Sequence, residues 1–169
     1  SNANLIAMLA ARDKINSKSK KSGLFKSKTL CAFVSEEAHY SFIKAGYQIG
    51  IGTDQIIQIQ SDLKGHMDTD LLLYQIDKAL SEGKTPFFVG ATAGTTVKGA
   101  FDPIKKINEI CKNFNLWFHI DGSWGGSVML SKKHRNLIRG SESSDSFTWC
   151  AHKMMGLPLI CSVILMKNK

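Results

Sequence analysis

The chain has 169 residues, of which 43% are hydrophobic and 21% charged, and its formal net charge is +8. This length and composition are typical of one globular domain with a substantial core, and they exclude wholesale disorder. No apolar run reaches the roughly 20 residues that a membrane-spanning helix needs. The four cysteines are well separated and form no CxxC pair, which favours reduced thiols in a cytoplasmic protein over disulfides or a zinc site.

Most of the excess positive charge lies in one serine-rich stretch near the N-terminus, where Asp13 is the only acidic residue. The stretch contains Arg12, Lys14, Lys18, Lys20, Lys21, Lys26 and Lys28. Aromatic residues do not alternate with these cations, as they do in grooves that bind single-stranded nucleic acid. We therefore interpret the stretch as a solvated helix end and loop, and we expect neither a nucleic acid nor a membrane partner.

Hydrophobic periodicity predicts helices that alternate with short buried strands. The predicted helices are 4–16, 35–46, 68–83 and one that starts at 102. The predicted strands are 29–34, 55–60, 86–92, 116–120, 146–149 and 159–163. This alternation indicates a three-layer α/β sandwich with a mostly parallel sheet. Residues 1–3 look like the remnant of a cleaved expression tag, so the domain is expected to span residues 4–169.

Local signals support several of these helix boundaries. In the first helix, Leu5, Met8, Leu9 and Arg12 recur at helical spacing. Ser35 is the expected N-cap of the second helix, which Gly46 would end. In the last helix we expect Asp102 to be the cap, followed by a proline in the first turn.

Polar residues follow four of the predicted strands, and in an open α/β sheet ligands bind at the carboxyl ends of the strands. Each residue also has a simpler interpretation. His39 fits a structural histidine, the hydroxyl-rich segment 92–96 fits a turn, Asp121 fits a helix cap, and Lys153 fits a charge in a surface turn. His119, within a strand pattern, we interpret as structural. Segment 92–96 has neither Walker nor GxGxxG spacing.

Taken together, His39, Thr95 and Thr96, Asp121 and Lys153 would share one edge of the sheet. This combination matches what pyridoxal 5'-phosphate requires. A lysine binds the cofactor as a Schiff base, a carboxylate keeps the pyridine nitrogen protonated, and a flat side chain stacks on the ring.

Four segments, in this order, resemble the pyridoxal-phosphate-dependent group II amino acid decarboxylases, in the branch of glutamate and cysteine sulfinate decarboxylases. They are SEEAHYSFIKAG, ATAGTTVKGAFDPI, LWFHIDGSWGG and SFTWCAHKMMG. The resemblance implies the aspartate aminotransferase-like large domain of that family. It also implies that the chain is a central fragment. A glycine-serine phosphate cup would precede Asn4, and a small domain, a mobile loop and a substrate-binding arginine would follow Lys169.

The resemblance assigns roles to six residues. Lys153 would be the Schiff-base lysine and His39 the stacking residue that assists proton delivery, so these two would be catalytic. The cofactor contacts would be His39, Thr96, Asp121, Ser123, His152 and Lys153. No metal is expected.

Two motifs depart from the family pattern. The family usually has Asp-Ala-Ala-Trp, whereas Gly122 and Ser123 follow Asp121 here. It usually has Asn-Pro-His-Lys, whereas Cys150 and Ala151 precede His152 here. A thiol in place of the asparagine should weaken phosphate binding.

The function implied by the resemblance is decarboxylation of an acidic L-amino acid (glutamate, cysteine sulfinate or aspartate) by a homodimeric intact protein, with the fragment itself inactive. Three alternatives remain: a drifted non-catalytic homologue, a different pyridoxal chemistry such as transamination or aldol cleavage, and a basic binding module.

Overall fold

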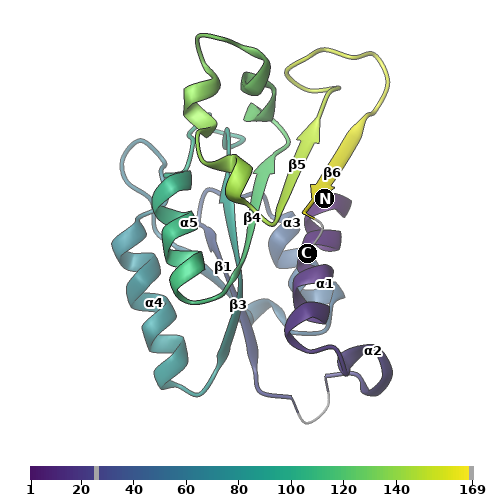
Figure 1. Cartoon of the computed structure of the whole chain (residues 1–169), viewed down its shortest axis with the longest axis vertical. Coiled ribbons are helices and arrows are strands. Elements are labelled where there is room, and N and C mark those ends of the chain that lie inside the picture. The colour runs from purple at the N-terminus through teal and green to yellow at the C-terminus, as the bar shows by residue number, and fades with distance from the viewer. Residues whose placement is uncertain (25–26, 168–169) are drawn as a thin grey trace.

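A computed structural model describes residues 1–24 and 27–167 of the chain (Figure 1). The helices are α1 (Asn2–Ile15), α2 (Ser19–Ser22), α3 (Ser41–Gln48), α4 (Thr69–Ser81) and α5 (Ile104–Asn113). The strands are β1 (Leu30–Ser35), β2 (Ile56–Ile59), β3 (Thr85–Thr92), β4 (Trp117–Gly122), β5 (Ser146–Cys150) and β6 (Ser162–Met166). Four short 3-10 helices are η1 (Thr53–Gln55), η2 (Gly125–Leu130), η3 (Arg135–Ile138) and η4 (Ser141–Ser143).

The strands form one sheet in the order β2-β1-β3-β4-β5-β6. All neighbouring pairs are parallel except β5 and β6, which are antiparallel. The prediction of an α/β fold with a mostly parallel sheet is confirmed. Because β1, β3, β4 and β5 run in the same direction, their carboxyl ends meet at one edge of the sheet, which is the upper edge in Figure 1.

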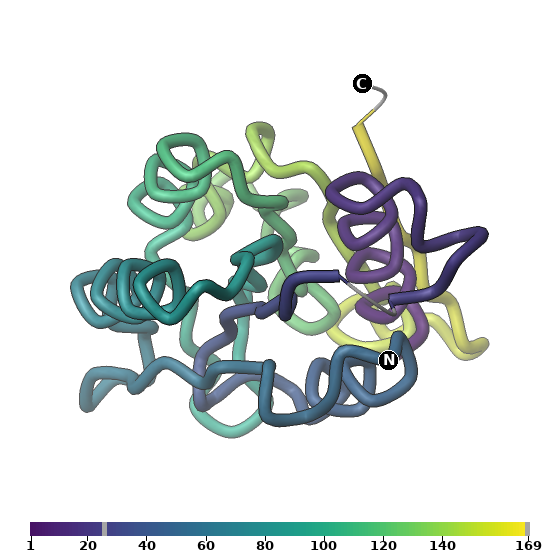
Figure 2. Tube along the Cα trace, turned by 90° about the horizontal axis from the view of Figure 1, so that it is seen from below, coloured from purple at the N-terminus to yellow at the C-terminus, as the bar shows by residue number. Residues whose placement is uncertain are grey.

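Helices cover both faces of the sheet, as the end-on view in Figure 2 shows. Helices α1 and α3 pack on one face, where Met8 and Phe42 contact Phe88 in an apolar cluster. Helices α4 and α5 cover the other face, where Ile76 and Ile107 belong to a second cluster. Each side chain named here is fully buried. These three layers fix the strand ends and hence the residues that follow them. Among the described residues, no helix is long and apolar enough to cross a bilayer.

The predicted first helix is confirmed as α1, where Met8 is buried and Leu5 packs against the same apolar cluster. Ala7, Met8 and Ala11 are buried, whereas Leu9 is 37% exposed. The alanines allow close packing of α1 against α3 and the sheet. Residues 1–3 continue this fold, because Asn2 and Ala3 begin α1 and Ala3 is buried. Their origin as a tag remnant stays a prediction.

Three predicted boundaries were wrong. Helix α3 begins at Ser41, because the Ser35 hydroxyl accepts a hydrogen bond from Glu37 N within a turn and so does not cap the helix. The predicted stop, Gly46, lies inside α3. Strand β6 begins at Ser162, three residues later than predicted. By contrast, the predicted helix at 68–83 corresponds to α4, whose N-cap is Asp68.

Asp102 does not cap α5. Its carboxylate instead accepts hydrogen bonds from Thr92 N at 2.7 Å and Met67 N at 2.8 Å. The side chain is 2% exposed, and burial raises its pKa to about 6. Asp102 therefore ties the end of β3 to the segment before α4.

The basic stretch lies at the end of α1, in α2 and in the following loop, in agreement with the interpretation as a helix end and loop. Arg12 and Lys20 both pair with Asp13, at 2.8 and 3.8 Å. Lys14 lies over the Trp117 ring at 5.5 Å from its centroid. Lys26 lies outside the described residues.

Candidate active site

A small cavity at the carboxyl edge of the sheet is lined by five of the six residues predicted to bind the cofactor. Its lining consists of Ser1, His39, Thr92, Gly94, Thr96, Asp121, Ser123, Trp124 and Lys153. All of these residues except Ser1, which precedes α1, follow or end β1, β3, β4 or β5, so the parallel strand order is what brings them together.

Asp121 is the most buried titratable group of this site, at 5% exposure. Its Oδ2 atom accepts a hydrogen bond from Asn4 Nδ2 at 2.7 Å, and its Oδ1 atom accepts one from Ser123 N at 3.0 Å. Burial alone would raise the pKa of Asp121, but the hydrogen bonds from Ser123 and Asn4, with the nearby His119, outweigh burial and lower it. Asp121 is therefore an anion inside the protein at neutral pH.

His39 lies in the turn between β1 and α3, and not within a helix as predicted. Its Nδ1 atom accepts a hydrogen bond from Ser41 N at 3.2 Å, so the neutral ring carries its proton on Nε2. Burial lowers the pKa of His39 and Lys153 lowers it further, against the opposing effect of Asp121. The ring is half-buried and neutral at pH 7.

Lys153 is exposed and lies in the turn after β5, as the sequence predicts. His152 does not line the cavity, because its Nδ1 atom lies 2.9 Å from Cys161 O and 3.1 Å from Cys161 N. This contact fixes the loop between β5 and β6. Cys150 is also directed away from the cavity, and its Sγ atom lies 2.9 Å from Ser162 Oγ.

Close contact between two backbone segments shapes the rim of the site. Gly125 N donates a hydrogen bond to Ala93 O at 2.9 Å. A Cβ atom at Gly125 would lie 2.5 Å from that carbonyl oxygen, and one at Gly94 would lie 2.8 Å from Gly125 N. Gly94 also has a φ of +85°, which favours glycine. Both glycines are therefore needed to bring Thr96 and Ser123 to the same rim.

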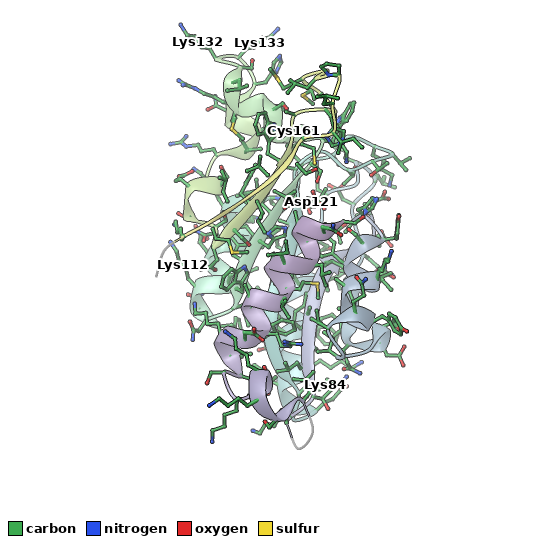
Figure 3. The ribbon with its side chains drawn as sticks, turned by 90° about the vertical axis from the view of Figure 1, so that its right-hand side faces the viewer. Lys84, Lys112, Asp121, Lys132, Lys133 and Cys161 are labelled. Carbon is green, nitrogen blue, oxygen red and sulfur yellow. The ribbon has the colours of Figure 1, made fainter. Side chains whose placement is uncertain are left out.

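The sequence predictions missed Asn4 and did not single out Thr92 or Trp124. Thr92 is 4% exposed, and its hydroxyl has no hydrogen-bond partner among the described residues. Asn4 contacts Asp121 across 117 positions of sequence, so only the docking of α1 could reveal it. Figure 3 shows Asp121 beside the N-terminal end of α1.

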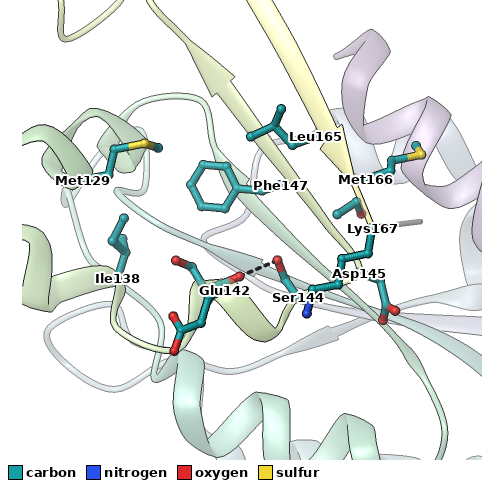
Figure 4. A pocket seen from close by; sticks show the side chains of 11 residues that line it. Met129, Ile138, Glu142, Ser144, Asp145, Phe147, Leu165, Met166 and Lys167 are labelled. Atoms are coloured by element: carbon teal, nitrogen blue, oxygen red, sulfur yellow. Dashed lines mark hydrogen bonds between the residues drawn. The ribbon is translucent and has the colours of Figure 1, made fainter. Parts of the chain in front are cut away.

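A second cavity, of about 310 Å³, lies between β5, β6 and the 3-10 helices (Figure 4). Its walls include Met129, Ile138, Phe147 and Leu165. None of the predicted site residues lines it, so the smaller cavity at the strand ends is the candidate site.

The chain matches the family model described as the pyridoxal-dependent decarboxylase conserved domain, over residues 1–169. It is 42% identical to mouse CSAD (cysteine sulfinic acid decarboxylase) in the apo form, with a TM-score of 0.97, covering 99% of this chain and 35% of that one. It is 29% identical to a glutamate decarboxylase domain from Vibrio parahaemolyticus, with a TM-score of 0.89, covering 98% of this chain and 37% of that one. It is 26% identical to Oryza sativa TDC with PLP, with a TM-score of 0.89, covering 98% of this chain and 35% of that one. The chain thus spans about a third of the length of the solved structures it matches.

Proposed function

The chain belongs to the pyridoxal-dependent decarboxylase family, and we propose that the full-length protein is a pyridoxal-phosphate-dependent enzyme that removes the α-carboxylate of an acidic L-amino acid. One observation supports this proposal above all others. An anionic buried carboxylate, a neutral half-buried imidazole and an exposed amine, those of Asp121, His39 and Lys153, face one cavity at the ends of parallel strands.

The donor set of the cavity fits pyridoxal phosphate. Asp121 is an anion that can hold a proton on a pyridine nitrogen, and Lys153 has an accessible amine for the aldehyde carbon. The Thr92 hydroxyl is buried without a partner and is free to bond a polar ligand atom. The cavity volume is only about 40 Å³, room for a water molecule. Its exposed lining residues are Ser1, Thr96, Trp124 and Lys153, so a cofactor-sized ligand requires side chains on this wall to move outward.

When bound, pyridoxal phosphate supplies an electron sink for the electrons left by carbon dioxide. The residues of this chain would perform the other tasks. Asp121 would keep the sink effective by holding the proton on the pyridine nitrogen. His39 would flank the ring, and its Nε2–H would be free to donate a hydrogen bond there, because Nδ1 accepts one from Ser41 N. Thr96 and Ser123, at the rim of the cavity, would contact the ring.

Three further properties belong to the proposal. The acidic substrate class (glutamate, cysteine sulfinate or aspartate) is supported by the similarity to mouse CSAD at 42% identity. Four free thiols are compatible with a reducing compartment such as the cytoplasm. We also propose a homodimer, in keeping with the family resemblance in the sequence.

Replacement of Lys153 tests the proposal. The full-length protein should bind pyridoxal phosphate with a visible absorption band, which Lys153→Ala should abolish because the amine that binds the aldehyde is lost. Lys133→Ala is the matched control, since Lys133 is an exposed lysine outside the cavity lining, and it should keep the band.

Product analysis separates the proposal from its rivals. Incubation with glutamate, aspartate or cysteine sulfinate should release carbon dioxide and the corresponding amine. A bound cofactor without any product would indicate the drifted homologue, and a keto acid would indicate transamination. Absence of the band in the full-length wild-type protein would refute cofactor binding itself.

A further inference from the structure

Three side chains of β4, those of Trp117, His119 and Asp121, point to the same face of the sheet because alternate residues of a strand share a face. Helix α1 covers this face and brings Asn4 against the strand. Ser146 of the neighbouring strand β5 is paired with His119 in the ladder. All of these except Trp117, which is half-buried, are at most 5% exposed.

Hydrogen bonds link the five side chains in a row. Trp117 Nε1 lies 2.8 Å from Ser146 Oγ, which lies 2.8 Å from His119 Nδ1. His119 Nε2 lies 3.1 Å from Asn4 Oδ1, and Asn4 Nδ2 lies 2.7 Å from Asp121 Oδ2. The row runs along β4 from Trp117, at the amino end of this strand, to the carboxylate of Asp121 in the candidate site.

The two ends of this row determine the direction of every bond. An ionised carboxylate only accepts, so Asn4 must present its amide nitrogen to Asp121 and its oxygen to His119. His119 Nε2 must then carry a hydrogen. At the other end the indole of Trp117 only donates, and Ser146 Oγ accepts from it. The Ser146 hydroxyl hydrogen is left for His119 Nδ1, which accepts it if the ring is neutral.

We infer that Asn4 and His119 are positioning residues, which hold the Asp121 carboxylate as an acceptor through a one-way hydrogen-bond chain that starts at Trp117. The inference rests on the proposed function, because it assigns the support of Asp121 in that site. Each donor in the chain polarises the next, so the chain strengthens the final bond to the carboxylate. Burial also lowers the pKa of His119 to about 4, so its ring is neutral at physiological pH.

The second hydrogen on Asn4 Nδ2 is bound as well. It goes to Ser41 Oγ at 3.0 Å, and Ser41 N bonds His39 Nδ1 at 3.2 Å. Asn4 thus also connects the support of Asp121 to the residue that orients His39. Rotation of the Asn4 amide would place its oxygen against the carboxylate, so only one orientation is allowed.

The inference is tested in the full-length protein by the affinity for pyridoxal phosphate and by the ¹⁵N chemical shift of the ring nitrogen of labelled cofactor. Asn4→Leu removes the donor to Asp121, and His119→Asn keeps an acceptor for Ser146 but is too short to reach Asn4. A hydrogen bond to a charged group supports an expected loss of affinity of about 10- to 100-fold in each variant. The nitrogen shift should move toward that of the unprotonated ring.

Two matched variants complete the test. His119→Gln places an amide N–H toward Asn4 Oδ1 and should keep most of the affinity. Asn16→Leu changes the same residue type at the other end of α1, where Asn16 bonds Ser27 at 2.7 Å, and should leave both readouts unchanged.

The absorption band of pyridoxal phosphate bound to the wild type tests the proposed function separately, so failure of the proposed function can be told apart from failure of this inference. If wild type binds the cofactor and Asn4→Leu and His119→Asn bind it equally well, the inference is wrong. The inference is also wrong if the affinity falls while the chemical shift of the ring nitrogen stays at its wild-type value, because that result would indicate a merely structural role for Asn4 and His119. Equal losses in His119→Gln and His119→Asn would likewise overturn it.

Discussion

Replacement of Gly122 by alanine tests how the end of strand β4, which carries Asp121, is packed. A Cβ atom at Gly122 would lie 2.6 Å from the Phe147 ring and 2.8 Å from the Thr148 carbonyl oxygen. The family resemblance places an alanine at this position, so the ring of Phe147 occupies space that an alanine methyl usually takes. Gly122 and Phe147 are therefore a matched pair in this chain.

The cost of Gly122→Ala can be bounded from this geometry. Overpacking a well-packed interior costs about 1–3 kcal/mol. Phe147 also lines the cavity of about 310 Å³ in Figure 4, so its ring has room to turn away from the added methyl. The Thr148 carbonyl oxygen cannot turn away in the same manner, so we expect a loss of about 1–3 kcal/mol, together with a fall in Tm of about 2–12 °C for a domain of this size.

A double-mutant cycle checks this explanation by urea unfolding followed by circular dichroism. Phe147→Val alone should destabilise the protein because it removes a buried ring. The double variant Gly122→Ala/Phe147→Val should be at least 1 kcal/mol more stable than the sum of the two losses predicts. Met8→Leu, on the opposite face of the sheet, is the control partner and should combine additively with Gly122→Ala. Additivity of the Gly122 and Phe147 changes within about 0.5 kcal/mol would refute the steric pairing.

Three other changes have defined outcomes. Burial raises the pKa of Asp102 from 3.8 to about 6, so the contribution of Asp102 to stability falls as pH rises from about 4 to 6. The variant Asp102→Asn does not titrate there, so over that range it should gain up to about 3 kcal/mol of stability relative to wild type. Burial lowers the pKa of His119 from 6.5 to about 4, so the contribution of His119 to stability is lost at pH 4 and is complete above pH 6.5. The wild type therefore gains stability as pH rises from 4 to 6.5, and His119→Gln, which does not titrate, should become less stable than wild type by up to about 3 kcal/mol more over that range. Urea unfolding at pH 4.5, 5.5 and 6.5 measures both, and parallel pH profiles for variants and wild type would contradict the two assignments. Gly125→Ala should cost more than Gly122→Ala, because its Cβ would lie 2.5 Å from the Ala93 carbonyl oxygen, a closer backbone contact than the 2.8 Å to the Thr148 carbonyl oxygen at Gly122. An equal or smaller loss in the same assay would contradict that account.

The sequence predicts the parts of the site that depend on strand ends. His39, Asp121 and Lys153 each follow or end a strand, and a parallel sheet brings such positions to one edge whatever the details of the helices. The helix boundaries are less predictable, since they depend on where side chains find long-range partners. Asp102 has the sequence context of a helix cap, yet its carboxylate bonds backbone N–H groups from two other segments.

The hydrogen-bond chain from His119 through Asn4 to Asp121 could be predicted only in part from the sequence. His119 and Asp121 are two residues apart on a predicted strand, so period two already places them on one face. The interpretation of His119 as structural agrees with its complete burial, but its link to Asp121 also needs Asn4. Asn4 lies on the buried face of α1 together with Ala7, Met8 and Ala11. The apolar spacing in this segment predicts a helix, but it does not identify a polar residue such as Asn4 as part of the buried face.

The two departures from the family pattern differ in their bearing on the site. Cys150 is buried and faces Ser162 across the β5–β6 pair, so the thiol changes strand packing next to the lysine turn and does not line the cavity. Ser123 does line it, and its backbone N–H is one of the donors that keep Asp121 ionised. The Ser123 side chain also lowers the pKa of Asp121, so the exchange of alanine for serine favours the charged form of Asp121 as well as changing the wall of the cavity. His39, Asp121 and Lys153, to which the proposed function assigns the main roles, line the same cavity as Ser123.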